Sequence, residues 1–297
     1  MLHKSGRNIP SWVWLCLLLL FTPAPRTLAQ QPASKPTATP LAPSQAPPSR
    51  DVPAARVSQT LIDSSIPDDP AVDQMLVAYA PKVRALETVI GRLKGELRKS
   101  GTGAGSLGTF VADGMRAQAA LKLGKPIDLA FMNSGGLRRI TIGEGELRAR
   151  DIFELLPFEN ALVTLELNGE QLLRLLQLIT TSREAQSGAR IVYVIKADKS
   201  SYLEKAVLRD ATGREKEIDP QAMYTIVTID YLVSVGGRYL VLREGKNLQP
   251  LGITVRDAIM TYVKSETAAA RDIKPNLDER FSLDRTNSVI TEEPPPQ

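Results

Sequence analysis

The residues best suited to chemistry lie in one stretch, residues 127–158. A largely apolar run ends at the four residues NSGG, and Arg138 follows one residue later. Glycine permits φ > 0 and leaves room for a ligand, while arginine presents a fixed fork of donors to a carboxylate or phosphate. Phe158 ends a short helical pattern twenty positions further on. An arginine and an aromatic ring suit a nucleotide-like ligand, although a β-turn followed by a core phenylalanine would give the same local pattern.

The first 29 residues have the composition of a cleaved secretory signal. Lys4 and Arg7 precede an apolar run, residues 12–21, and small residues follow at Thr27 and Ala29. That run of about ten residues is shorter than the roughly twenty that a membrane helix needs. We therefore expect export to the periplasm or the medium, with an uncleaved anchor as the alternative. The position of Cys16 inside the run argues against a lipid-modified cysteine.

Cleavage of this signal would change the chemistry of the chain. His3 and Cys16 are the only histidine and the only cysteine, so the mature chain would have no imidazole, thiolate or disulfide. Of the 37 basic residues, Lys4, Arg7 and Arg26 would leave, and the remaining 34 face 33 acidic ones. This near-neutral balance does not support a nucleic-acid partner, and the apolar runs give no stable membrane span.

The rest of the chain divides by composition into a tether, a folded domain and a tail. Residues 30–66 are rich in Pro, Ala, Ser and Thr and should form a disordered tether, because they cannot bury enough apolar surface to offset ordering entropy. Residues 67–284 form the expected folded domain, and residues 285–297, which end in EEPPPQ, a disordered tail.

Hydrophobic periodicity predicts an α+β domain with mixed sheets layered with helices. A helix capped by Asp68 or Asp69 should begin at Pro70, and a hairpin turn is expected at Thr212-Gly213. Further helices are predicted over residues 107–123, 150–156, 171–181 and 254–265, and strands over residues 85–98, 127–132, 161–167, 190–196, 205–210 and 224–230.

Motifs in a fixed order give the chain a family likeness. Residues 71–283 resemble the C-terminal domain of the 5′-nucleotidases, the family that also contains UDP-sugar hydrolase. The matching segments are ETVIG (87–91), LGTFVADGMR (107–116), NSGGLR (133–138), LLPFEN (155–160), LELNGEQLLRLL (165–176), SGARIVYV (187–194), YTIVTIDYLVSVGG (224–237) and RDAIMTYVK (256–264).

The resemblance implies the substrate-holding half of a two-domain enzyme, whose other half is a metallophosphatase with two metal ions. In the substrate-holding half, arginines hold the anionic part of the nucleotide and two aromatic rings sandwich the base. The corresponding substrate-binding residues of this chain are Asn133, Gly135, Gly136, Arg138, Phe158, Tyr231, Gly236 and Gly237. Stacking is worth about 1–3 kcal/mol per base and an arginine on an anion about 1.5–3 kcal/mol, so these contacts would dominate affinity.

The chain departs from the family pattern near the second aromatic position. Leu232 occupies that position and Tyr231 precedes it, so either Tyr231 stacks through a local shift or the second ring is missing. Arg238 stands where the family has the ribose-binding Asp. A further upstream arginine has only Arg98 as a candidate. Asp113 is interpreted as a structural acceptor rather than an acid catalyst.

The expected function follows from the absence of catalytic groups in the mature chain. Dinuclear phosphate hydrolysis needs clustered metal ligands, typically several imidazoles, and a Ser or Cys nucleophile needs a base. No cofactor is therefore expected in this chain. Divalent metals are expected only in a separately encoded metallophosphatase, for which this chain would bind the nucleotide or nucleoside. The alternatives are a non-catalytic nucleotide-binding protein and a degenerate structural protein of the envelope.

Overall fold

The structure is a computed structural model that describes residues 57–289. Contacts divide the chain into two units, residues 1–63 and 64–297, and the account below concerns the second. The predicted signal peptide and most of the predicted tether lie outside the described residues, as do residues 290–297 of the predicted tail.

The helices follow the apolar patterns of the sequence closely. Asn168 and Gln171 form a capping box at the start of α5, and the Thr254 hydroxyl caps α7 by accepting from the Asp257 N–H at 3.0 Å. The described helices are α1 (Pro70–Leu76), α2 (Ala80–Leu86), α3 (Gly105–Leu123), α4 (Ala149–Leu155), α5 (Gly169–Ser182), α6 (Asp230–Val235) and α7 (Val255–Ala268).

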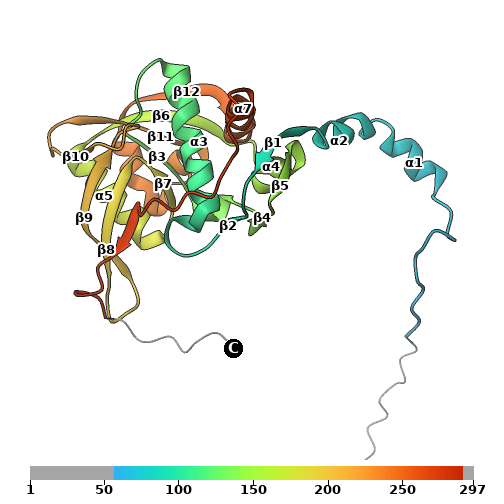
Figure 1. Ribbon diagram of the computed structural model, residues 1–297, viewed down its shortest axis with the longest axis horizontal. Helices are drawn as coiled ribbons and strands as arrows, with labels where there is room; N and C mark the ends of the chain where they lie inside the picture. The colour runs from blue at the N-terminus through green and yellow to red at the C-terminus, as the bar shows by residue number, and fades with distance from the viewer. Residues whose placement is uncertain (1–56, 290–297) are drawn as a thin grey trace, which may run out of the picture. The chain divides into compact units, whose positions relative to one another are not determined.

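Two larger sheets form the body of the domain (Figure 1). The five-stranded sheet has the order β12-β6-β11-β3-β7, in which only the β11–β3 pair is parallel, and the four-stranded sheet has the order β10-β9-β8-β13. The predicted α+β fold with mixed sheets is therefore confirmed. The strands are β3 (Leu129–Met132), β6 (Ala161–Asn168), β7 (Ala185–Ser187), β8 (Ala189–Ile195), β9 (Ser201–Arg209), β10 (Glu215–Glu217), β11 (Met223–Ile229), β12 (Lys246–Thr254) and β13 (Phe281–Leu283), together with two small pairs, β1 (Val89–Leu93) with β5 (Gly145–Arg148) and β2 (Leu97–Arg98) with β4 (Thr141–Ile142).

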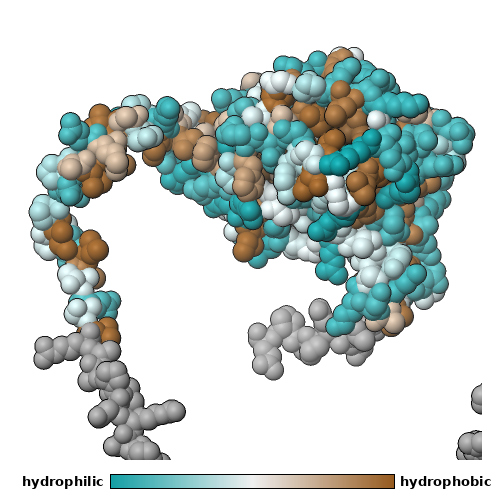
Figure 2. Space-filling model, turned by 180° about the vertical axis from the view of Figure 1, so that it is seen from behind, coloured by the Kyte–Doolittle hydropathy of each residue, from teal (hydrophilic) through white to brown (hydrophobic). Residues whose placement is uncertain are grey.

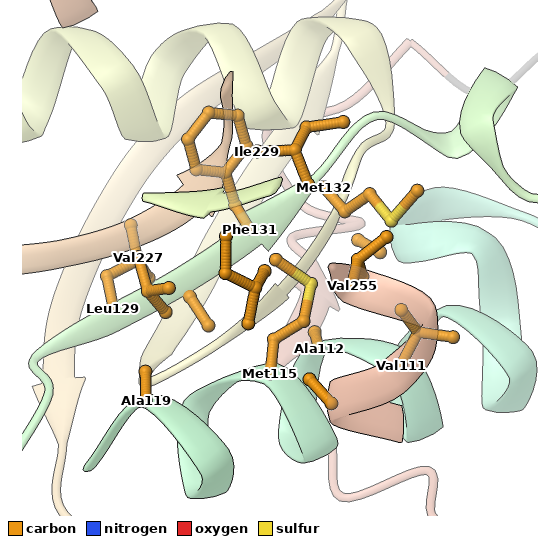
Figure 3. Close-up of a cluster of buried hydrophobic side chains, with 14 of the residues drawn as sticks. Val111, Ala112, Met115, Ala119, Leu129, Phe131, Met132, Val227, Ile229 and Val255 are labelled. Carbon is orange, nitrogen blue, oxygen red and sulfur yellow. The ribbon is translucent and has the colours of Figure 1, made fainter. Parts of the chain in front are cut away.

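The core lies between α3 and the five-stranded sheet. Figure 3 shows Met115 and Ala119 of α3 on one side of β3 with Val227 of β11 nearby, whereas the Phe131 ring points to the other side of β3. These side chains are fully or almost fully buried. At about 25 cal/mol per Å² of apolar area removed from water, such packing holds β3 rigidly, and β3 leads directly into the NSGG turn.

Gly188 joins the two sheets at the β7–β8 connection. Its φ is +117°, and a Cβ at this position would lie 2.1 Å from the backbone oxygen of Asp128, just before β3. Only glycine satisfies both requirements, so this residue sets how closely the β7–β8 connection approaches the start of β3.

Two predictions of secondary structure were wrong. The predicted strand over residues 85–98 is the end of α2 followed by β1 and β2, because Gly95, at φ +99°, turns the chain between the two strands. The turn at Thr212-Gly213 does form a hairpin, but it joins β9 to the short β10 rather than to β11.

The segment containing α1 and α2 has no fully buried side chain, and half-buried Leu86 at the end of α2 is the residue that packs against the core. Asp69 caps α1 by accepting from the Ala71 N–H at 2.8 Å, as predicted, yet neither helix has a buried residue. Figure 2 shows hydrophobic side chains exposed along this segment. The exposed apolar residues are Ile66, Val72, Met75, Leu76, Val77, Tyr79 and Val83.

Candidate functional site

Arg138 and Phe158 are neighbours at the surface. The guanidinium carbon of Arg138 lies 5.0 Å from the centroid of the Phe158 ring, within cation–π range. The Arg138 N–H donates to the Leu155 carbonyl at 2.9 Å, which ties the residue to the end of α4. Within the described part of the chain the guanidinium has no ion pair or hydrogen bond, so its donors are free for a ligand.

The turn before Arg138 is a single 3-10 turn, η2 (Ser134–Gly136). A Cβ on Gly136 would lie 2.5 Å from the Met132 methyl and 3.1 Å from Asn133 Oδ1, whereas Gly135 has room for one. Neither glycine has a positive φ. The expectation that these glycines supply φ > 0 was therefore wrong, and close packing is the reason for glycine at position 136.

Asn133 presents an acceptor at the base of this turn. Its Oδ1 is buried and has no hydrogen-bond partner among residues 57–289. Buried polar atoms are nearly always satisfied in folded proteins, so this orphaned acceptor in the turn before Arg138 is a candidate partner for a ligand donor.

Glu184, which the sequence patterns did not indicate, holds the turn in place. Its carboxylate is 3% exposed and accepts from the Ser134 N–H at 2.5 Å and from the Tyr239 hydroxyl at 2.8 Å. Tyr239 belongs to η3 (Gly237–Glu244), the segment after the glycine pair. Burial, together with this hydrogen bond, raises the pKa of Tyr239 well above 10. Glu184 thus connects the two halves of the predicted site.

The structure distinguishes Tyr231 from Leu232. Leu232 is fully buried in the core, whereas the Tyr231 side chain on α6 is 49% exposed. The Ala161 N–H donates to Asp230 Oδ1 at 3.1 Å, so the first turn of α6 is fixed to the chain three residues beyond Phe158. Of the two, Tyr231 is therefore the residue that can reach a ligand.

The glycine pair turns the chain from α6 into η3. Gly236 and Gly237 have φ of +66° and +58°, which favour glycine. Arg238, in the position of the family's acid, lies 5.8 Å over the Tyr239 ring and donates to the Ser182 hydroxyl at 3.2 Å. No carboxylate replaces that acid at this position.

Arg256 supports the loop that carries Phe158. This residue is 7% exposed, donates to the Leu156 carbonyl at 3.3 Å, forms an ion pair with Glu159 and lies 4.5 Å over the Phe153 ring. It stands in the first turn of α7, where the helix dipole disfavours a cation. That unusual placement was a sequence signal for a structural role.

Arg98, the predicted upstream arginine, does not contact the turn. Its guanidinium pairs with Glu96 at 2.5 Å and is largely exposed. The neighbouring Lys99 instead donates its Nζ proton to the Leu137 carbonyl at 3.0 Å. Lys99 is thus the upstream cation that lies beside Arg138 in the chain's fold.

A cavity on the other side of α3 lies away from these residues. It measures about 1020 Å³ and is lined by α3, the β9–β10 hairpin and α7, and none of the predicted site residues touches it. Arg138 and Phe158 lie instead on an open surface, where stacking on an exposed ring needs no enclosed cavity.

Residues 57–289 contain neither a cluster of metal ligands nor a membrane-spanning helix. No group of three or more His, Cys, Asp or Glu residues there is arranged to hold a metal ion. Within the same residues no helix has the length and apolarity to cross a membrane.

Comparison with known protein families gives a match over the region just described. The sequence model of the family described as "5′-nucleotidase, C-terminal domain" matches residues 87–244. An apyrase of Tabanus yao is 24% identical over 47% of this chain and 27% of its own. Protein UshA of Yersinia enterocolitica is 22% identical over 74% of this chain and 36% of its own. The chain thus spans about a quarter to a third of these relatives.

Solved structures give the same fold. A 5′-nucleotidase precursor from Thermus thermophilus superposes with a TM-score of 0.59 at 25% identity, covering 73% of this chain and 44% of that one. The NAD nucleotidase NadN of Haemophilus influenzae gives a TM-score of 0.56 at 18% identity over 75% and 42% of the two chains. The second likeness shows the fold alone.

Proposed function

Because the chain belongs to the family of 5′-nucleotidase C-terminal domains, we propose that it binds a nucleotide or nucleoside, with Phe158 and Tyr231 against the base and Arg138 on the anionic group. The observation that carries this proposal is the unpartnered guanidinium of Arg138 over the exposed Phe158 ring. The orphaned acceptor of Asn133 supports it, because a base or sugar carries donors.

Calorimetry with adenosine, AMP and UDP-glucose tests this binding. All three should bind, and Phe158→Ala should weaken each by roughly tenfold or more, because stacking is worth about 1–3 kcal/mol per base. Asn133→Ala should weaken them too. Phe153→Ala is the matched control, since Phe153 is equally exposed but lies under Arg256. Unchanged affinity for the Phe158 variant would contradict the proposal.

We further propose that the chain is exported and binds the nucleotide for a separately encoded metallophosphatase. The exposed apolar side chains on the elements around the site support such a partner, because they offer surface that a second protein could bury. They are Ile140, Phe153, Phe158, Tyr231, Val235 and Leu240. In this arrangement the partner supplies the divalent metals and this chain positions the nucleotide.

A reconstitution experiment tests the partnership. The purified chain is mixed with the metallophosphatase, and phosphate release from AMP is compared with that of each component alone. The proposal expects hydrolysis by the mixture that exceeds the sum of the two, and loss of that excess with Phe158→Ala. A mixture no faster than the metallophosphatase alone, combined with normal calorimetric binding of AMP, favours the second candidate, a nucleotide-binding protein without hydrolysis.

A further inference from the structure

The cavity of about 1020 Å³ lies along the outer face of α3. In Figure 1, α3 stands between the sheet that contains β8, β9 and β10 and the helix α7. Asp113, Arg116, Ala117 and Ala120 recur at helical spacing and line the floor, the β9–β10 hairpin forms one wall, and Tyr262 and Glu266 form the other. The floor is thus the side of α3 opposite to its core-facing residues.

The acidic side chains that line this cavity are already engaged. Asp128 accepts from the Thr225 N–H at 2.7 Å, and the other four each have an arginine partner. The ion pairs are Asp113 with Arg280, Asp210 with Arg214, Glu215 with Arg190 and Glu266 with Arg271. Their negative charge is therefore largely neutralised within the protein.

Two lining cations have no such partner within residues 57–289. Arg116 donates to the carbonyls of Ile127 at 2.8 Å and Arg209 at 3.0 Å, and it forms no ion pair. Carbonyls orient its guanidinium without cancelling its charge, and its Nη1 has no partner among the described residues. Lys216, on the exposed β10, has neither a hydrogen bond nor an ion pair there. Arg116 and Lys216 are therefore the lining cations without an ion pair, and Asp128, held by a backbone N–H, is the lining acid without one.

Apolar residues form much of the remaining lining. Ala117, Ala120, Pro126, Leu208 and the Tyr262 ring supply it. Burial raises the pKa of Tyr262 to about 12, so this phenol is neutral and adds no negative charge near neutral pH. Ligand pockets commonly combine such apolar walls with a few convergent polar groups.

We propose that this cavity is a second small-molecule site, distinct from the candidate nucleotide site, for an organic anion with an apolar body. A carboxylate or phosphate group is held by Arg116 and Lys216, and the apolar part lies against Tyr262 and the alanines of α3. A neighbouring hollow of about 360 Å³ shares Arg116, Arg209 and Asp210 with the cavity. A longer ligand can therefore extend from the cavity into this hollow, toward Asp113 of α3 and its partner Arg280.

Phenyl phosphate and benzoate are suitable probes, with benzyl alcohol as the uncharged analogue. The titration uses the purified Arg138→Ala variant, so that the candidate nucleotide site adds no anion binding, and amide NMR shifts report the location. Saturable shifts in α3, β10 and α7 are expected, with benzyl alcohol about tenfold weaker or more. Tighter binding of phenyl phosphate identifies a phosphate ligand, and tighter binding of benzoate a carboxylate.

Lys216→Glu tests the assignment without disturbing the fold, and Lys246→Glu is its matched control. Both lysines are exposed strand residues without an ion pair in the described structure. Lys216→Glu should weaken the preferred anion about tenfold, Lys246→Glu should leave it unchanged, and Ala120→Trp should abolish binding by filling the cavity. Absence of saturation by about 10 mM, or equal effects of the two lysine variants, would overturn the proposal. Neither result bears on adenosine binding by the wild-type chain.

Discussion

A single exposed guanidinium carries the proposed specificity for a charged ligand. The Arg138 guanidinium has no partner in the described structure except the Phe158 ring. Arg139, its neighbour, pairs instead with Asp151 at 2.9 Å and Glu154 at 3.1 Å. Two adjacent arginines therefore have separate roles, one oriented by an aromatic ring and the other bound to α4.

The Arg138→Ala substitution should weaken the binding of AMP much more than the binding of adenosine. A hydrogen bond to a charged group contributes about 1.5–3 kcal/mol, so a loss of about tenfold to a hundredfold is expected for AMP. The free energy of unfolding should change by less than about 0.5 kcal/mol, because the side chain is exposed. Arg139→Ala is the control and should keep the difference between AMP and adenosine. Calorimetry and urea unfolding measure both effects.

Tyr239→Phe should cost about 0.5–1.5 kcal/mol of stability at neutral pH, because the donor to Glu184 is lost. The folded-state pKa of Tyr239 is raised, so the stabilisation by its protonated phenol is complete below the unfolded value near 10 and declines as pH rises above it. The variant should therefore lose less stability than wild type between about pH 9 and 11. Burial also raises the pKa of Tyr262, to about 12, so both proteins should still lose some stability at alkaline pH.

At the scale of elements, the turns position the site more than the strands do. Gly188 fixes the β7–β8 connection against the start of β3, and Gly236 and Gly237 fix the passage from α6 to η3. Because these turns leave no space or require a left-handed conformation, small changes there should propagate to Arg138 and Tyr231.

Gly188→Ala should destabilise the domain by at least about 1–3 kcal/mol, because the new Cβ would lie 2.1 Å from a backbone oxygen and the residue has positive φ. Gly143→Ala is the matched control, since nothing lies within 4 Å of its Cβ position. Thermal unfolding of both variants measures the difference. Equal melting temperatures would show that the β7–β8 connection can move away from Asp128.

The sequence was informative where a pattern is local. The helices over residues 107–123 and 171–181 were predicted because their apolar residues recur at short spacing in the chain. Arg138 and Phe158 were selected as site residues from their types, but the contact between them comes from the structure, because the two are twenty positions apart in the chain. Glu184 was not, because its partners Ser134 and Tyr239 are 50 and 55 residues away and only the fold brings them together.

At the scale of the whole molecule, one arginine fastens the C-terminal segment to the body. Arg280 donates to Asp113 of α3 at 2.9 Å, to Asp278 at 2.7 Å and to the Gln186 carbonyl at 2.8 Å. Burial opposes the charge of Arg280, yet the hydrogen bonds and the charges of Asp278 and Asp113 outweigh this and raise its pKa. These contacts hold β13 beside β8.

Asp278→Asn should reduce stability by about 1.5 kcal/mol at neutral pH, because one carboxylate is lost from Arg280. Burial raises the pKa of Asp278, but Arg280 and Arg209 lower it more, so the folded value is below 3.8. Its stabilisation is therefore present above pH 3.8 and is lost as pH falls through the lower folded value.

The stability difference between wild type and the Asp278→Asn variant should narrow as the pH is lowered from about 5 to 2. Urea unfolding across that range measures it. Asp68→Asn, at an exposed position, is the control. A constant difference across the range would contradict the assignment of the carboxylate as the titrating group.

The position of β12 and β13 at sheet edges has a consequence for biosynthesis. Residues 246–254 complete the five-stranded sheet and residues 281–283 the four-stranded one, and Arg280 reaches back 167 residues to Asp113. A growing polypeptide that stops before these segments has both sheets open at an edge, with α3 unfastened. The two edge pairings can therefore form only after residues 246–283 have been synthesised, and until then the nascent chain exposes unpaired strand edges.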